Sequence, residues 1–98
     1  MSTWTRQPQE REGTYFFSGK FLVTATVNEE LSQAEILAIY RDVKSYVKEN
    51  EGADYLFVYI DEDERKLFFI DQLNSEMIAS GGHPPEHNYC TLLFAHEY

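Results

Sequence analysis

The clearest periodic pattern in the chain predicts one long helix. Beginning at Ile36, apolar side chains recur at spacings of three and four residues, which places them on one face of a helix. Just before them, Ser32 and Glu35 form the S-x-x-E pattern of a capping box, in which each side chain accepts a hydrogen bond from a backbone N–H group. Gly52 suits the end of a helix. The pattern therefore predicts a helix over residues 32–50.

A period of two predicts the first strand. Phe21, Val23, Ala25 and Val27 alternate with other side chains in a stretch rich in β-branched residues, and this pattern is typical of a strand. The segment at 15–17, before the Ser-Gly break, is expected to pair with this strand as a short hairpin arm.

Three further strands are expected in the second half of the chain, at 55–60, 65–70 and 89–95. The first is apolar on both faces and should lie inside the sheet. The acidic stretch 61–64 is expected to make the turn of an antiparallel hairpin. Residues 71–88 lack a period and are interpreted as a long loop with a helical turn around 75–79.

Together these elements predict an α+β domain, with one long helix packed on a small, mainly antiparallel sheet of four to five strands. Residues 1–13 are polar apart from Trp4 and are expected to form a flexible N-terminal arm, and residues 14–98 a single domain. A single helix can leave one side of a sheet uncovered, which is compatible with a homodimer.

Charge narrows the classes of partner. The 98-residue chain has a formal net charge of -9 at pH 7. Residues 1–48 hold six basic and six acidic residues, whereas residues 49–98 hold two basic and eleven acidic residues. An acidic surface repels nucleic acid and anionic membranes and suits a basic protein partner.

The location is expected to be cytoplasmic. The first residues include no apolar stretch of the kind found in a signal peptide, and no apolar run approaches the roughly 18 residues of a membrane span. The single cysteine cannot form an internal disulfide, which favours a reducing compartment.

Six acidic residues are the candidate partner-binding residues. They are Asp61, Glu62, Asp63 and Glu64 in the predicted turn, followed by Asp71 and Glu76. The turn lacks the D-x-D-x-D-G spacing of a calcium loop, so it is interpreted as a solvated acidic turn.

One segment spells a metal-binding motif. Residues 83–87 read H-x-x-E-H, the pattern of inverted zincin proteases, in which a helix presents both histidines to zinc. Pro84 and Pro85 occupy the two middle positions, and proline is excluded from a helix interior. His83 and His87 are therefore not expected to share a helical face. A non-helical site that also uses Cys90 or His96 stays open, as does a thiol nucleophile at Cys90.

Two segments of the second half carry a resemblance to a known family. Phe68–Asp71 reads F-F-I-D, near the F-F-K-I-D of that family, and Leu92–Tyr98 is similar to its closing T-I-M-L-A-x-E-Y. With Met77 and Gly81-Gly82 at similar offsets, residues 19–98 resemble the bacterial uncharacterised-domain family numbered 3768. The lysine of the first motif is missing here. The resemblance implies no activity, although members occur among plasmid and mobile-element genes.

Three hypotheses about function follow. The first is a small acidic cytoplasmic interaction protein that binds a basic protein surface. The second is a mobile-element anti-defence protein that acts as a nucleic-acid mimic. The third is a metal-binding protein or enzyme that uses the segment from His83 to Glu97. The first is preferred, with no catalytic residue, metal ligand or cofactor assigned.

Overall fold

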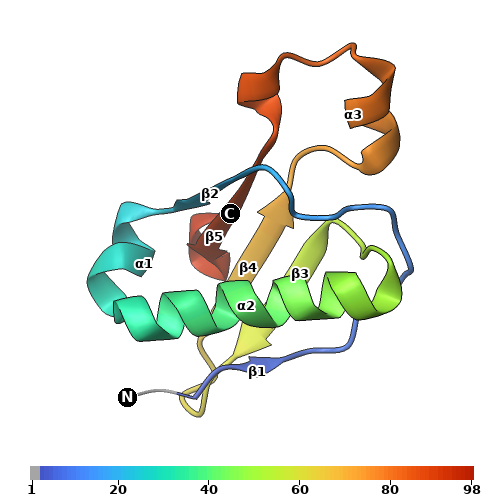
Figure 1. The fold of residues 1–98 in the computed structure, drawn as a ribbon. Coiled ribbons are helices and arrows are strands. Elements are labelled where there is room, and N and C mark those ends of the chain that lie inside the picture. Colours follow the sequence, from blue (N-terminus) through green and yellow to red (C-terminus); the bar gives the residue numbers. More distant parts are fainter. Residues whose placement is uncertain (1–2) are drawn as a thin grey trace.

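The computed structural model describes residues 3–98, which form a five-stranded sheet with a long helix lying across one side (Figure 1). The strands are β1 (Thr5–Arg6), β2 (Lys20–Val23), β3 (Leu56–Ile60), β4 (Lys66–Asp71) and β5 (Tyr89–Phe94). Their order across the sheet is β1-β3-β4-β5-β2, and every pair is antiparallel except β2 with β5. The predicted α+β class with a mainly antiparallel sheet is confirmed.

The helices of the described residues are α1 (Ala25–Glu30), α2 (Gln33–Asn50) and α3 (Ser75–Ser80), with short 3₁₀ turns η1 (Pro85–His87) and η2 (Ala95–Glu97). The prediction of the long helix is confirmed in α2, including its cap. The Glu35 N–H donates to Ser32 Oγ at 3.1 Å, and the Ser32 N–H donates to Glu35 Oε1 at 2.9 Å.

This cap gives a first testable prediction. Ser32→Ala removes the acceptor of the Glu35 N–H and is expected to lower the free energy of unfolding by about 1 kcal/mol, the usual contribution of an N-cap. Urea melts measure this loss. Ser45→Ala, on an exposed position within α2, is the control and should leave stability within about 0.5 kcal/mol. Equal losses in the two variants would contradict the cap.

The predicted strand over 21–27 is wrong in its second half. The strand ends at Val23, and Thr24 begins α1: its side chain accepts from the Val27 N–H at 3.2 Å. The Thr24 N–H still bonds to the Leu92 carbonyl at 3.2 Å, so this residue joins the sheet to the helix. Val27 is fully buried as a helical residue. A short capped helix can bury the same apolar side chain that a strand would. The alternation of apolar residues therefore did not distinguish a helix from a strand here.

The predicted hairpin arm at residues 15–17 is also wrong. Tyr15 pairs with Ala53, not with β2. Phe17 has a positive φ of 52° and is fully buried, with its ring edge-on to Phe57 and Phe69. Burial of this large ring compensates for a backbone conformation that non-glycine residues rarely adopt.

Residues 3–13, for which the sequence predicts a flexible arm, contain the edge strand β1 and side-chain anchors on both sides of it. The Trp4 indole N–H donates to Glu35 Oε2 at 3.1 Å, and Arg6 forms an ion pair with Asp42 at 3.0 Å. The Gln9 side chain bonds to the Leu56 carbonyl and to the Asp54 N–H, both at 2.7 Å. The segment therefore runs along the free side of β3.

The core lies between α2 and one face of the sheet. Alternate residues of the central strands are buried there, from Phe57 and Tyr59 to Phe69 and Leu92. The helix contributes the buried stripe Ile36, Ile39, Val43 and Val47. The helix α2 thus covers only one face of the sheet.

Candidate interaction surface

Two of the six acidic candidates have their carboxylates inside the protein. Asp61 is 5% exposed, and it accepts bonds from the backbone N–H groups of Asp63 and Arg65 and from Arg65 Nε at 2.8 Å. Burial alone would raise the pKa of Asp61, but these bonds outweigh it and the pKa is lowered. Asp61 therefore shapes the β3–β4 turn and has no oxygen to offer a partner.

Asp71 is the second of these. It is 3% exposed, and its Oδ2 accepts from the Phe17 N–H at 2.9 Å. Burial raises the pKa of Asp71, and bonds from backbone N–H groups and the charge of Lys44 offset this only in part. This carboxyl group fixes the left-handed turn at Phe17.

The other four candidates, Glu62, Asp63, Glu64 and Glu76, are exposed. Glu62 accepts from the Thr3 N–H at 3.0 Å, and Glu76 lies in α3, which has no buried residue. The predicted role of these four in partner binding stays a prediction.

The H-x-x-E-H segment is not an α-helix, as its prolines predict. Pro84 is in the extended polyproline region, and η1 begins at Pro85. Within residues 3–98, no three histidine, cysteine or acidic residues gather in a way that could hold a metal ion. Cys90 is fully buried, and burial together with the charge of Asp71 raises the pKa of its thiol to about 12. A thiol of this kind is a poor nucleophile at neutral pH.

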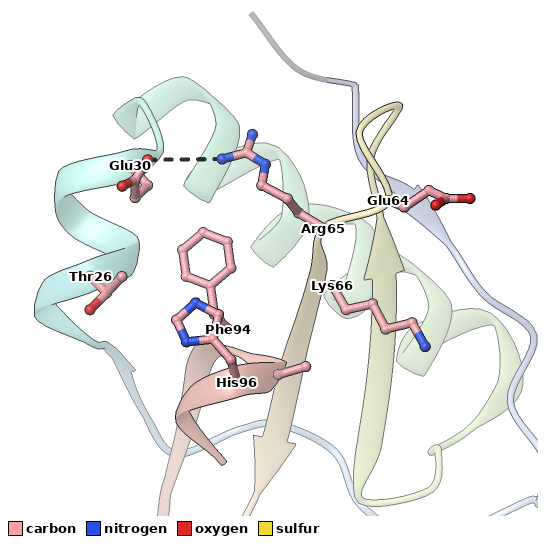
Figure 2. Close-up of a pocket in the computed structure, with 8 residues that line it drawn as sticks. Thr26, Glu30, Glu64, Arg65, Lys66, Phe94 and His96 are labelled. Atoms are coloured by element: carbon pink, nitrogen blue, oxygen red, sulfur yellow. Dashed lines mark ion pairs between the residues drawn. The ribbon is translucent and has the colours of Figure 1, made fainter.

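A pocket of about 410 Å³ lies between α1, the start of β4 and η2 (Figure 2). Phe94 lies at its centre, and Arg65 reaches over it towards Glu30, to which it is paired at 3.9 Å. Glu64 and Lys66 point away from the Phe94 ring. The nearby charges are mixed and Arg65 is held by two carboxylates, so the pocket does not select one class of ligand.

The face of the sheet opposite α2 has a different character. None of its side chains is buried, and its apolar residues are not part of the core cluster. Strand alternation and the register assign twelve positions to it: Thr5, Lys20, Leu22, Leu56, Val58, Ile60, Lys66, Phe68, Ile70, Tyr89, Thr91 and Leu93. We call this set the open face.

The apolar side chains of the open face form continuous rows across the strands. Val58, Phe68 and Leu93 are directly opposite one another in the register, and Leu56, Ile70, Thr91 and Leu22 form the next row. Phe68 lies at the centre, and its ring contacts the ring of Tyr98, which is itself 77% exposed. Among protein surfaces in general, contiguous apolar patches of this kind are typical of interaction sites.

Acidic residues border the open face but do not occupy it. Glu10 and Asp54 line a groove of about 380 Å³ together with the basic residues Arg11 and Lys66 and the apolar residues Leu56, Val58 and Ile60. Glu62 lies beside Ile60 at the other end of β3. The twelve positions include two lysines and no acid, although the chain has 17 acidic residues. The open face is thus an apolar centre with a predominantly acidic rim, in which Glu10, Asp54 and Glu62 outnumber Arg11.

Sequence reasoning found the possibility of an uncovered sheet face but not its residues. The strand predicted at 55–60 is apolar on both faces and that at 89–95 largely so, and this pattern was the available indication. The acidic rim residues Glu10 and Asp54 were missed because they are far apart in the sequence and meet only where residues 7–11 pass β3.

Comparisons with protein-family models, with curated proteins and with solved structures found no match to this chain. The resemblance to the family numbered 3768 therefore stays a prediction. No helix within residues 3–98 has the length and apolar character that crossing a membrane requires.

Proposed function

We propose that this chain is a protein-interaction domain whose open face docks on a partner protein with an apolar patch surrounded by basic residues. The observation that carries the proposal is the half-buried apolar set centred on Phe68, which no helix covers. Burying such a surface is the main source of affinity in protein complexes, at roughly 25 cal/mol per Å² of apolar area.

Charge supports the choice of partner. The rim carboxylates and the net charge of -9 attract a basic surface and slow the approach of acidic proteins. Rim charges act mainly on the rate of encounter, whereas the apolar centre determines how long the complex lasts. Substitutions in the rim should therefore change mainly the association rate, and substitutions in the apolar centre mainly the dissociation rate.

The alternatives have less support. A nucleic-acid mimic needs exposed carboxylates in place of phosphates, and Asp61 and Asp71 are turned inward. A metal site or thiol chemistry would have to use the segment from His83 to Glu97, in which Cys90 is buried and donates to the Lys20 carbonyl at 3.6 Å. A thiol buried in the core is not accessible to a substrate, and free cysteine in such a position acts as a small apolar side chain.

The proposal is tested with a synthetic amphipathic helical peptide that has leucine on one face and lysine on the other. In titrations followed by amide NMR spectra, we expect shifts in β3, β4 and β5 and weaker binding as salt is added. Phe68→Ser should weaken binding at least about tenfold, as loss of a central aromatic anchor does.

Two controls make the result specific. Leu37→Ser removes an exposed apolar side chain from α2, 45% exposed, and should leave binding unchanged. A leucine–glutamate peptide of the same pattern should not bind, because the acidic rim repels it. Shifts confined to α2 or to the 61–64 turn, or an unchanged affinity in Phe68→Ser, would count against the proposal.

A further inference from the structure

The two edges of the sheet are protected to different extents. At one edge, β1 has two residues, the Thr5 carbonyl accepts from the Gln7 side chain at 3.2 Å, and Pro8 follows. Short strands and proline are the usual devices that stop an edge from pairing with another chain. At the other edge lies β2, which is four residues long and includes no proline; its one charged residue, Lys20, stands at its first position.

The hydrogen bonds of β2 show which of its backbone groups are free. The N–H groups of Lys20 and Thr24 bond inward, to the carbonyls of Asn88 and Leu92. In a parallel pair, alternate residues turn to opposite sides, so the N–H and C=O groups of Phe21 and Val23 point outward. Within the described residues β5 is the only strand beside β2, and β2 is the last strand in the order across the sheet.

This edge is also held rigidly. The Phe21 ring stacks on Tyr40 with ring centroids 4.5 Å apart and lies 5.3 Å from the Phe69 ring. The strand therefore presents two donors and two acceptors in fixed positions, and an added strand would not have to order them first.

We infer that β2 pairs with the β2 strand of a second copy of this chain, antiparallel and about a twofold axis. The outward groups fix the register: Phe21 of each copy faces Val23 of the other, Leu22 lies on the axis, and Lys20 faces Thr24. Four backbone hydrogen bonds form, and no like charges are directly opposite. The interface is self-complementary, as twofold symmetry requires.

The dimer joins two open faces into one. From strand spacing and rise, one face covers on the order of 400 Å², whereas a specific interface buries about 800 Å² on each partner. Two faces side by side, with Leu22 of both copies at the seam, reach that area. This consequence rests on the proposed function, but the dimer itself does not.

Sedimentation velocity of the full chain over a range of concentrations tests the dimer. Val23→Pro removes an outward N–H group, leaves the β2–β5 bonds intact, and should weaken the dimer at least about tenfold, because symmetry removes two of the four bonds. Val23→Ala is the matched control, which loses side-chain bulk but keeps the N–H group, and should stay within about threefold of the wild type. Since two acidic chains repel each other, salt should strengthen the dimer.

A second measurement keeps the inference falsifiable if Val23→Pro does not fold. In the wild type, the Phe21 and Val23 amides should become protected from hydrogen exchange as protein concentration rises, while the Leu22 amide stays protected throughout. Three outcomes would each overturn the inference. The chain could remain a monomer at every protein and salt concentration, or form a dimer that Phe68→Ser disrupts and Val23→Pro does not. The third is hydrogen exchange at the Val23 amide that does not change with protein concentration. A peptide that fails to bind an intact dimer would count against the proposed function alone.

Discussion

Phe69→Ala is expected to lower the free energy of unfolding by about 3–5 kcal/mol, and Phe68→Ala, one residue away, by less than about 1 kcal/mol. Phe69 is fully buried, with the rings of Phe17 and Phe21 at 5.0 Å and 5.3 Å. Its truncation leaves a cavity that these rigid neighbours cannot fill. Phe68 belongs to the open face and loses its contact with Tyr98 and its cross-strand neighbours Val58 and Leu93, without leaving a closed cavity.

Urea melts of the two variants measure both losses. Because the two side chains differ by one position in the same strand, strand propensity and chain position are matched, and only the face of the sheet differs. Similar losses in both would mean that the open face is covered in solution. At concentrations where the chain binds a partner or a second copy, the loss in Phe68→Ala should grow, since binding adds to stability.

Asp71→Ala is expected to cost about 1–3 kcal/mol when measured at pH 4, because the buried Phe17 N–H loses its acceptor. The effect should spread to the region around Phe17, whose positive φ depends on this bond. The Phe17 amide should exchange faster with solvent in this variant. Glu76→Ala, an exposed acid a few residues further on, should leave stability within about 0.5 kcal/mol.

The same residue predicts a pH dependence. Burial raises the folded-state pKa of Asp71 above its ordinary value of 3.8, so the folded state favours the protonated form. Its contribution to stability is complete below the unfolded pKa and is lost as pH rises through the folded pKa. The difference in stability between Asp71→Asn and the wild type should therefore rise in favour of the variant as pH increases above 4.

Comparing the two proteins at each pH removes the contribution of other groups. Asp61 has a lowered pKa and contributes with the opposite sign, because its stabilising bonds are lost as pH falls. A difference that stays constant with pH would contradict the buried, weakly acidic carboxyl group described for Asp71.

The long helix and the antiparallel strands were predictable because local patterns determine them. Each of three local patterns predicts a single element. The Ser32 cap and the apolar stripe from Ile36 to Val47 predict the helix α2, and the run that is apolar on both faces predicts the strand β3. Around Thr24 the sequence is compatible with either a strand or a short capped helix, because both would bury Val27. Long-range pairing with Leu92 determines where the strand ends, and no local pattern shows it.

The candidate surface was less predictable than the fold. The charge count located the acids in the second half of the chain, but the exposure of each carboxylate depends on its backbone neighbours. Asp61 and Asp71 accept hydrogen bonds from backbone N–H groups that only the folded turns bring close to them. In the sequence they are acidic residues like the exposed Glu62, and nothing local marks them as buried. The open face needed the register of strands far apart in the chain before its rows became visible.

The parallel pairing of β2 with β5 also has a consequence for how the chain folds. Residue 20 pairs with residue 89, and β5 lies between β4 and β2. Bringing residues 20 and 89 together closes a long loop, and its entropy cost is incurred before the contacts between the strands compensate for it. We therefore expect β2 to join the sheet late in folding. During synthesis, a ribosome would have released α2, β3 and β4 while the apolar residues of β2 still lacked their partner. Among the strands, β2 is thus expected to wait longest for its partner during synthesis.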